Sequence, residues 1–507
     1  MIKKRTISMK NYLAYGVGDF LGAGTTALTA VWLLYFYTNF CGLTPIEATF
    51  IFAAARVLDA VISPLMGYLT DNFGKTYLGQ RFGRRKFFIL IGIPLIFSYS
   101  VMWAPGMSYI YYLLTYLFFD MVYTMILVPY ETLVPEMTDD FKQKAKFSGA
   151  RISTAQLSAI LAGFLPGILL SYLGKDNAIS FFYASLVFSI LCAIALTLVY
   201  LFTWERPKEL KSEAELKAEQ EKTSLSFKEN FKRLIIELLS TFKIKIFRQH
   251  LGMYLGGYIA QDIFNATFTY YVVFVLLKEA TVASMLIGIM SITQFIAVLG
   301  MMPLCIKYGP AAAYRGVVTI FGMSCLAFGV IWYFNLSSIH LILVVLSAIA
   351  GLGRGGINYV PWNIYTYISD IDEIITGKRR EGIFAGVMTF TRKASQAGAV
   401  MLIGISLQFS GFTADSPLQS PEVIHAILFI MVFGAILVLS CGFYVSLKFK
   451  LNLKTHKVLI DEINNIKGIG TNSERRISDE GKPVVEMLTG MKVNELWGNN
   501  NIGYKEK

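Results

Sequence analysis

Charged side chains inside long apolar stretches are the first feature of this sequence that points to chemistry. Arg56, Asp59 and Ser63 are spaced three and four residues apart in one such stretch, so a helix would present them on one face. Asp120 and Thr124 are four residues apart in a later stretch. A charge near the centre of a bilayer costs at least about 2.5 kcal/mol, so such groups are usually functional. We therefore expect these residues to form a functional site, with purely structural ion pairs as the alternative.

Further ionisable side chains are distributed over other apolar stretches in both halves of the chain. They are Asp19, Glu131, Arg151, Asp262, Arg354, Arg392 and Lys393. Acids and bases on many different helices imply a shared polar cavity, which fits a path for a solute better than one packed ion pair. The alternative is that these groups only pair with one another and lock the helices together.

Cysteine and histidine spacing gives no indication of a metal centre or an enzyme active site. The five cysteines are scattered, and no histidine is close in sequence to a cysteine or to another histidine. No combination of a nucleophile and a base is recognisable either. We therefore expect a protein that is not an enzyme and that needs no metal or cofactor.

Membrane-crossing helices are the elements that must position these charges. The 507 residues are 55% hydrophobic and only 16% charged, and the mean hydropathy of +0.53 is too high for a water-soluble protein of this length. Since about 20 apolar residues cross a bilayer core, the apolar stretches predict twelve transmembrane helices. Their approximate ranges are 11–40, 45–70, 87–104, 108–134, 150–172, 178–203, 251–278, 281–305, 312–334, 339–368, 382–410 and 423–447.

Loop charge predicts which side of the membrane the termini occupy. Twelve crossings place both termini on one side, and the segments expected there carry Lys3, Lys4, Arg5, Lys10, Lys75, Arg81, Arg84, Arg85, Lys86, Lys142, Lys144, Lys146, Lys307, Lys378, Arg379 and Arg380. The opposite loops carry little beyond Lys175 and Lys278. Because cytoplasmic loops collect Lys and Arg, we predict a multi-pass protein of the cell (inner) membrane with both termini in the cytoplasm. The net charge of +12 then reflects topology rather than nucleic-acid binding.

One long polar stretch interrupts the apolar pattern and divides the chain. We predict an N-terminal six-helix half over residues 1–203, a cytoplasmic central loop over 204–250, a C-terminal six-helix half over 251–447 and a cytoplasmic tail over 448–507. The run 351–356 fits the G-x-G-x-x-G pattern, but no strand precedes it. Close packing of helices is its expected role.

Ordered motifs over residues 15–393 resemble the glycoside–pentoside–hexuronide:cation symporter family of the major facilitator superfamily. They are YGVGDF, YFYTN, ARVLDAVISPLMGYLTD, GRRKFFILIG, VPYETLVPEMT and SDIDEIITGKRREGIFAGVMTFTRK. The resemblance implies an all-α membrane protein of two six-helix halves that binds a sugar between them. It also implies symport with sodium or a proton by alternating access. Asp71, Arg84 and Arg85 resemble the superfamily's cytoplasmic loop after the second helix, which implies a part in gating.

The family's cation site is only partly present in this sequence. The resemblance assigns one carboxylate of that site to Asp59 and its threonine to Thr124. Two further carboxylates fall on Ser63 and Leu127, and a lysine that precedes the eleventh helix in the family falls on Ile375.

The loss of two carboxylates bears on the coupling ion. Sodium needs several oxygen ligands, whereas a proton needs one titratable group. We therefore predict proton coupling through Asp59, with Asp120 as a second carrier and Arg56 as a neighbouring charge. Sodium remains the alternative.

The resemblance also indicates where a sugar would bind. Arg151 and Trp362 match the family's sugar-binding arginine and tryptophan, its aromatic residue on helix four falls on Glu131, and Asp19 lies one turn before Ala23, where the family has an acid. The predicted substrate-binding residues are Asp19, Tyr123, Glu131, Arg151, Trp362 and Lys393. Because Arg354, Arg392 and Lys393 add positive charge to the path, a hexuronide is a candidate beside neutral glycosides and oligosaccharides.

Two other functions remain open at this stage. One is the movement of lipids or lysolipids, as in distant members of the superfamily, and the other is a membrane sugar sensor without transport. The expected partners are a small sugar or sugar acid and the lipid bilayer, and we expect a monomer.

Overall fold

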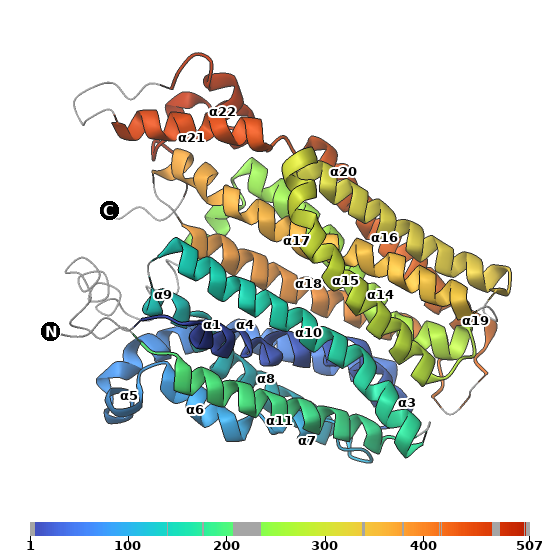
Figure 1. Cartoon of the computed structure of the whole chain (residues 1–507). Coiled ribbons are helices and arrows are strands. Elements are labelled where there is room, and N and C mark those ends of the chain that lie inside the picture. Colours follow the sequence, from blue (N-terminus) through green and yellow to red (C-terminus); the bar gives the residue numbers. More distant parts are fainter. Residues whose placement is uncertain are drawn as a thin grey trace.

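The computed structural model describes residues 6–500 and 502, apart from 139, 175–176, 206–234, 337–339, 378–379, 415, 417 and 469–476. Within these described ranges the regular structure is helical and includes no strand, which confirms the predicted all-α class. Figure 1 shows long helices packed side by side, with the two chain ends at the same end of the bundle. Several basic residues used to predict the topology lie outside the described ranges, namely Lys3, Lys4, Arg5, Lys175, Lys378 and Arg379.

In the described part of the N-terminal half, the helical segments form six long helices, some of them interrupted. The first is a broken helix, and its segments are α1 (Met9–Gly16), η1 (Phe20–Thr25), α2 (Thr26–Leu28), η2 (Thr29–Leu33) and α3 (Leu34–Asn39). The others are built from α4 (Pro45–Asn72), α6 (Lys86–Leu95) with α7 (Ser98–Val101), α8 (Tyr109–Glu131) with α9 (Leu133–Met137), α10 (Phe141–Leu173) and α11 (Ile179–Phe202). The short η3 (Phe73–Lys75) and α5 (Tyr77–Phe82) connect α4 to α6.

The described part of the C-terminal half also consists of long helices. Its helices are α14 (Lys245–Tyr270) with η5 (Tyr271–Val275), α15 (Ala280–Tyr308), α16 (Pro310–Tyr333), α17 (His340–Thr376) and α18 (Glu381–Phe409). The last long helix contains α19 (Pro421–Leu428), η7 (Phe429–Gly434) and α20 (Ala435–Lys448). The tail adds α21 (Leu453–Gly468), α22 (Lys482–Thr489) and η8 (Val493–Glu495). Each of the twelve predicted ranges therefore overlaps a helix, although most of the predicted central loop lies in the undescribed residues 206–234.

Eight helices of the described chain are long and apolar enough to cross a membrane, and the count is nine when α4, bent by 40°, is taken as one span. The apolar helix Lys86–Val101 is shorter than the others. The long helices α14 and α18 are outside this count, and they carry Asp262, Arg392 and Lys393 within their length. The chain is a multi-pass membrane protein, and the exact number of twelve crossings stays a prediction.

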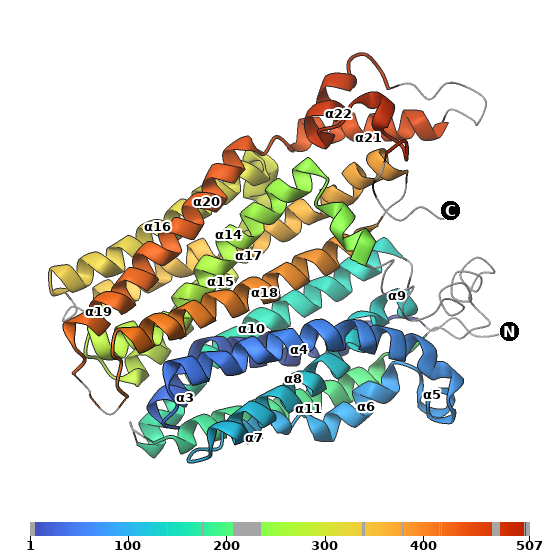
Figure 2. The same ribbon diagram turned by 180° about the vertical axis from the view of Figure 1, so that it is seen from behind.

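Close contacts between the two halves lie toward the end of the bundle opposite the termini. A Cβ on Gly163 of α10 would lie 2.8 Å from the Cα of Gly288 on α15, so only glycine permits this approach. The backbone N–H of Gly167 donates to Oγ of Ser284 at 2.9 Å. Figure 2 shows α18 lying along α4, where a Cβ on Gly404 would lie 2.1 Å from Oγ1 of Thr49.

The glycine run at 351–356 packs α17 against its neighbours. A Cβ on Gly351 would lie 2.3 Å from the carbonyl oxygen of Met290, and one on Gly355 would lie 2.4 Å from that of Gln294, both on α15. A Cβ on Gly356 would meet Val317 of α16 at 2.2 Å. The expectation that this run serves helix packing is confirmed.

Candidate functional site

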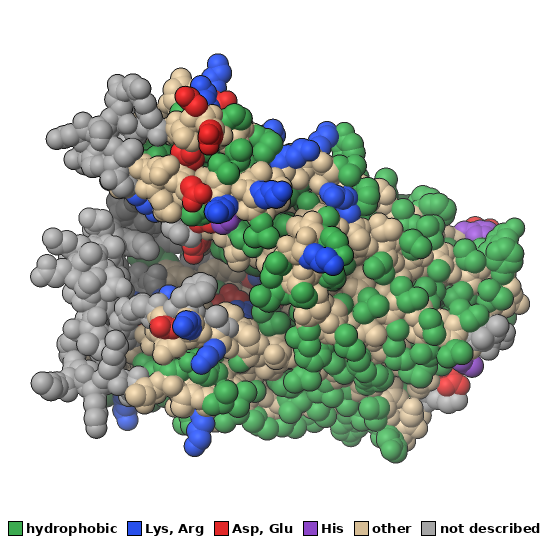
Figure 3. All heavy atoms as spheres, turned by 45° about the horizontal axis from the view of Figure 1, so that its top comes forward, with side chains coloured by type: hydrophobic (Ala, Val, Ile, Leu, Met, Phe, Trp, Pro, Cys, Tyr) green, Lys and Arg blue, Asp and Glu red, His purple; other side chains and the backbone are tan. Residues whose placement is uncertain are grey.

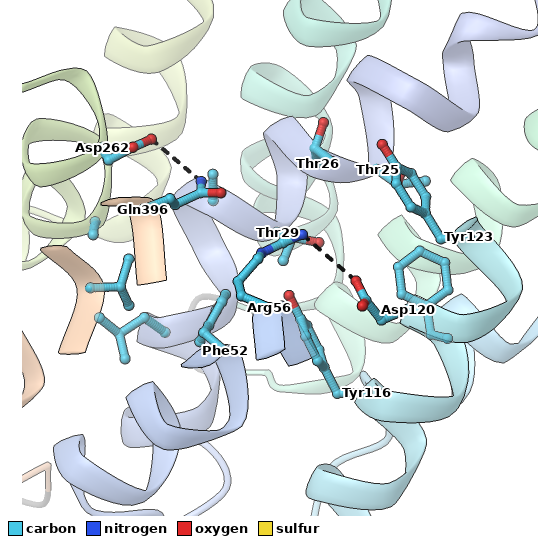
Figure 4. A pocket seen from close by; sticks show the side chains of 15 residues that line it. Thr25, Thr26, Thr29, Phe52, Arg56, Tyr116, Asp120, Tyr123, Asp262 and Gln396 are labelled. Atoms are coloured by element: carbon cyan, nitrogen blue, oxygen red, sulfur yellow. Dashed lines mark hydrogen bonds and ion pairs between the residues drawn. The ribbon is translucent and has the colours of Figure 1, made fainter. Parts of the chain in front are cut away.

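A cavity with charged and hydroxyl side chains in its wall, here called the central cavity, lies between the two halves and spans about 660 Å³, including the part that is open to solvent. Its lining residues are Thr25, Thr26, Thr29, Ala30, Leu34, Phe52, Arg56, Tyr116, Phe119, Asp120, Tyr123, Asp262, Ala266, Gln396 and Val400. Figure 4 shows ten of these side chains converging from both halves. Figure 3 shows a hollow between the halves at the end of the bundle that carries the termini, with charged side chains on its walls.

The broken first helix brings three hydroxyl groups to the central cavity. Thr25 ends the π-helical segment η1, and Thr29 begins η2, with Thr26 between them. Wider π-helical turns often occur at functional sites because they shift the direction in which side chains point. Sequence reasoning missed these threonines, and the only signal was the run TTALT within an otherwise apolar stretch.

Asp59 on α4 lies at the centre of a compact polar cluster. Its Oδ1 accepts hydrogen bonds from Oγ1 of Thr124 at 2.5 Å and from Oγ of Ser63 at 3.0 Å. Its Oδ2 contacts the ammonium of Lys393, which comes from α18 in the other half. Asp59 is only 1% exposed. The structure therefore brings together three residues predicted for cation coupling and adds a lysine that was predicted for the substrate.

The lysine that contacts Asp59 is not at the position to which the resemblance assigned the family's lysine. The sequence comparison placed the family's lysine on Ile375, but Ile375 lies at the far end of α17, where its carbonyl accepts hydrogen bonds from Gly498 and Asn500. The ammonium that reaches the cation cluster belongs to Lys393. Lys393 lies about three helical turns into α18, and which lysine approaches Asp59 depends on how α18 packs against α4.

Arg56 does not pair with Asp59, its neighbour on the same helical face. Instead Nη1 of Arg56 lies 3.7 Å from Oδ1 of Asp120 on α8 (Figure 4), and both residues line the central cavity. The other oxygen of Asp120, Oδ2, is buried and has no hydrogen-bond partner within the described structure. The Asp120 carboxyl therefore keeps one oxygen available to a proton or to a ligand.

Three predicted substrate residues form a second cluster in the N-terminal half. Nε of Arg151 on α10 donates to Oδ1 of Asp19 at 3.0 Å, and its Nη2 donates to Oε1 of Glu131 at 2.7 Å. Tyr123 lines the central cavity, and its hydroxyl donates to the carbonyl oxygen of Gly22 at 3.2 Å. A guanidinium fixed between two carboxylates presents both donors and acceptors, which is the combination that sugar hydroxyls require.

The C-terminal half contributes its own polar groups. The guanidinium of Arg392 contacts both carboxylate oxygens of Asp262, with Nη2 at 2.7 Å from Oδ1. Gln396 donates a hydrogen bond to the same Oδ1 at 3.4 Å, as Figure 4 shows. Trp362 donates through Nε1 to the hydroxyl of Tyr258 at 3.2 Å and is 40% exposed.

Arg354 is a further buried arginine of the C-terminal half. It is 8% exposed, its Nη1 contacts the sulfur of Met290 at 3.6 Å, and its Nε has no hydrogen-bond partner within the described structure. Arg354 and Trp362 are not among the residues that line the central cavity.

The predicted gating loop forms an ion-pair network within the N-terminal half. Arg84 and Arg85 both contact Oε1 of Glu136, at 2.5 Å and 2.8 Å. The carboxylate of Glu205, which follows α11, accepts from the backbone N–H groups of Arg84, Arg85 and Lys86 at 2.8–3.1 Å and so caps the start of α6. Sequence reasoning missed both glutamates, and the side chain of Asp71 lies outside the described part of the chain.

The described residues contain no group of three or more His, Cys, Asp or Glu side chains placed to hold a metal ion.

Two packed halves of long apolar helices, with a polar cavity between them, define a secondary membrane transporter. The family model described as "MFS/sugar transport protein" matches residues 14–452, so the chain belongs to this family of the major facilitator superfamily. The predicted relationship to the glycoside–pentoside–hexuronide:cation symporters and the predicted class of sugar symporter are thereby confirmed.

Individual relatives share low identity with the chain over nearly its whole length. The glucuronide carrier protein homolog of Escherichia coli (strain K12) is 24% identical, and the match covers 93% of this chain and 98% of the relative. The putative sulfoquinovose importer of the same strain is 25% identical, with coverage of 91% and 95%. The isoprimeverose transporter of Lactiplantibacillus pentosus is 23% identical, with coverage of 84% and 85%.

Solved structures support the same fold. The crystal structure of a D-xylose-proton symporter superposes with a TM-score of 0.57 and 14% identity, covering 87% of this chain and 96% of that one. A structure of a proton-dependent oligopeptide transporter gives a TM-score of 0.59 at 12% identity, with coverage of 90% and 100%.

Proposed function

We propose that this transporter carries a sugar or sugar acid together with a proton, and that Asp59 is the coupling group. The observation that carries the proposal is the contact between Asp59 on α4 and Lys393 on α18, which joins the two halves beside the central cavity. Ser63 and Thr124 complete the cluster by donating hydrogen bonds to the same carboxylate.

The charge on Asp59 would control the attraction between the halves. While Asp59 is ionised, its carboxylate attracts the ammonium of Lys393 in a site that excludes most water, where such attraction is strong. A proton on Asp59 removes this attraction and leaves the halves free to move apart at this point. One carboxylate with two hydroxyls and an ammonium is suited to a proton, whereas sodium would have to displace Lys393 and find further oxygen ligands.

The proposed substrate path uses the Arg151 cluster of the N-terminal half and the exposed aromatic residue of the other half. Arg151, Asp19 and Glu131 would hydrogen-bond sugar hydroxyls, Tyr123 would line the path, and Trp362 would stack on a ring. The relatives whose names specify a solute handle a glucuronide, isoprimeverose and sulfoquinovose. These names support a sugar or sugar acid, and two of the three denote anionic solutes.

Alternating access would follow from rocking of residues 1–203 against residues 251–447, with 204–250 as the connection and 448–507 as a tail. We propose that both termini are in the cytoplasm of a cell whose inner membrane holds the transporter as a monomer. The hollow in Figure 3 then opens to the cytoplasm, and the close contacts Gly163–Gly288 and Thr49–Gly404 close the outer side.

Uptake into proteoliposomes tests the proposal. Neutral glycosides and uronates are screened with a pH gradient or a sodium gradient imposed separately. We expect at least one class to accumulate with the pH gradient and to carry protons inward. Accumulation that depends on sodium and ignores the pH gradient would overturn proton coupling, and binding without flux would indicate a sensor.

A further inference from the structure

A second cavity lies where the start of the C-terminal tail meets the C-terminal half, and it shares no lining residue with the central cavity. It spans about 550 Å³ of space, including the part that is open to solvent. Its lining residues are Met302, Cys305, Ile306, Pro310, Tyr359, Asn363, Tyr367, Leu451, Asn452, Leu453 and His456. They come from α15, the start of α16, α17 and the start of the tail, so this cavity, here called the tail cavity, exists only while the tail is docked.

The tail is held on α17 by specific contacts. Nε2 of His456 lies 2.8 Å from Oδ2 of Asp370, and Nζ of Lys467 lies 2.6 Å from Oε1 of Glu373. The backbone N–H groups of Trp497 and Gly498 donate to the last turn of α17 at 2.8 Å. The tail cavity therefore lies within an interface that specific contacts between the tail and α17 hold together.

One side of the tail cavity is apolar and faces outward from the bundle. Met302 and Ile306 on α15 are 58% and 56% exposed. Exposed apolar side chains on a membrane-crossing helix face lipid chains. The other side offers hydrogen-bonding groups, namely the ring hydroxyls of Tyr359 and Tyr367, the amides of Asn363 and Asn452, and the imidazole of His456.

Exposed lysines are close in sequence to the lining residues of this amphipathic cavity. Lys307 directly follows the lining residue Ile306, and the segment 441–460 that enters the tail carries Lys448, Lys450, Lys454 and Lys457 without any Asp or Glu. All five lysines are exposed. Figure 3 shows Lys and Arg side chains over the tail, together with Asp and Glu side chains, beside the apolar surface of the bundle.

The N-termini of two helices add partial positive charge at the tail cavity. α16 begins at Pro310 and α21 begins at Leu453, and both residues line the tail cavity. The start of a helix carries partial positive charge.

We propose that the tail cavity binds one anionic phospholipid from the leaflet on the side of the termini. The phosphate would lie among the tail lysines and the two helix starts, and the acyl chains would run along Met302 and Ile306. A polar pocket flanked in the sequence by exposed lysines, with exposed apolar side chains on one side, suits an anionic headgroup that carries acyl chains. Because the tail forms one wall, the bound lipid would stabilise the docked tail.

The test compares lipids and lysines in the purified full-length transporter. Protein stripped of lipid in detergent is mixed with phosphatidylglycerol, phosphatidylcholine with the same chains, or soluble glycerol phosphate. Native mass spectrometry measures the lipid retained, and thermal unfolding measures stabilisation. We expect one phosphatidylglycerol per protein and a higher Tm, with little effect of the other two compounds.

Two triple variants separate the tail cavity from general attraction to charge. Lys450→Gln/Lys454→Gln/Lys457→Gln removes three charges at the tail, and Lys142→Gln/Lys144→Gln/Lys146→Gln removes three on the other half. Since each lysine near an anionic surface contributes about 1 kcal/mol, or about fivefold in affinity, the first variant should weaken retention by on the order of a hundredfold. Equal retention of both phospholipids, equal loss in both variants, or equal binding of glycerol phosphate would overturn the proposal.

Discussion

The carboxylate of Asp59 contacts the ammonium of Lys393 although 334 positions separate the two residues in the chain. α4 carries the first residue and α18 the second, so the contact joins the two halves of the transporter. The Asp59 side chain is 1% exposed and that of Lys393 is 26% exposed. In such a buried setting the charge state of one carboxyl changes the attraction between two large parts of the molecule.

The first prediction concerns Asp59→Asn. The amide cannot carry a proton or attract Lys393, so uptake driven by a pH gradient should fall to background. Exchange of labelled against unlabelled solute needs no net proton movement and should continue. Ser63→Ala is the matched control, because it removes one hydrogen bond and leaves the carboxyl in place. A variant Asp59→Asn that still accumulates solute would contradict the assigned role.

The second prediction concerns the stability of the ion pair. Lys393→Met leaves the Asp59 carboxylate buried without its cation, which should cost about 3–5 kcal/mol. Asp59→Asn/Lys393→Met removes both charges and should be less destabilising than the sum of the single changes. Unfolding of the purified variants in detergent measures these differences. Additive effects would show that the two side chains do not interact in solution.

The third prediction concerns the end of the bundle opposite the termini, which we propose is the closed outer side. In Gly163→Val the added side chain meets the backbone of Gly288, where the first new atom alone would lie 2.8 Å from a Cα. The state with this end closed should become less populated, and net transport should fall. Gly149→Val is the control on the same helix, since a Cβ there meets no atom within 4 Å.

Labelling of a cysteine at Thr29 reports the change of state. In a background without the native cysteines, Thr29→Cys should react with an impermeant thiol reagent applied from the outer side more readily when Gly163→Val is present. Equal labelling in both backgrounds would mean that this glycine contact does not close the path.

The fourth prediction concerns substrate affinity. Arg151→Lys keeps the charge, but one ammonium cannot replace the planar guanidinium group, which donates hydrogen bonds to Asp19 and Glu131 at the same time. Loss of one charge-assisted hydrogen bond should raise KM about tenfold with a smaller change in kcat. Arg81→Lys on the exposed helix α5 serves as the control. An unchanged KM would place the solute elsewhere.

Local spacing was sufficient for several parts of the site. Asp59 and Ser63 are four residues apart on a helix, and the structure joins them at 3.0 Å. The run of glycines at 351–356 packs α17 closely, as its small residues indicate. Family motifs placed Thr124 beside Asp59, and Arg151 beside the acids of its own half. These features depend on the helical repeat or on matched motifs, and both can be read along the chain.

The sequence by itself determined the membrane class, the approximate helices and the residues at which charge enters the apolar core, because hydropathy and helical periodicity are local properties. Only the tertiary structure decided that Arg56 pairs with Asp120, that Lys393 and not Ile375 faces the cation cluster, and that Glu205 caps α6. Those partners depend on how far each helix is rotated about its axis and where it crosses its neighbours. Contacts between distant residues, such as Gly163 with Gly288, set both quantities.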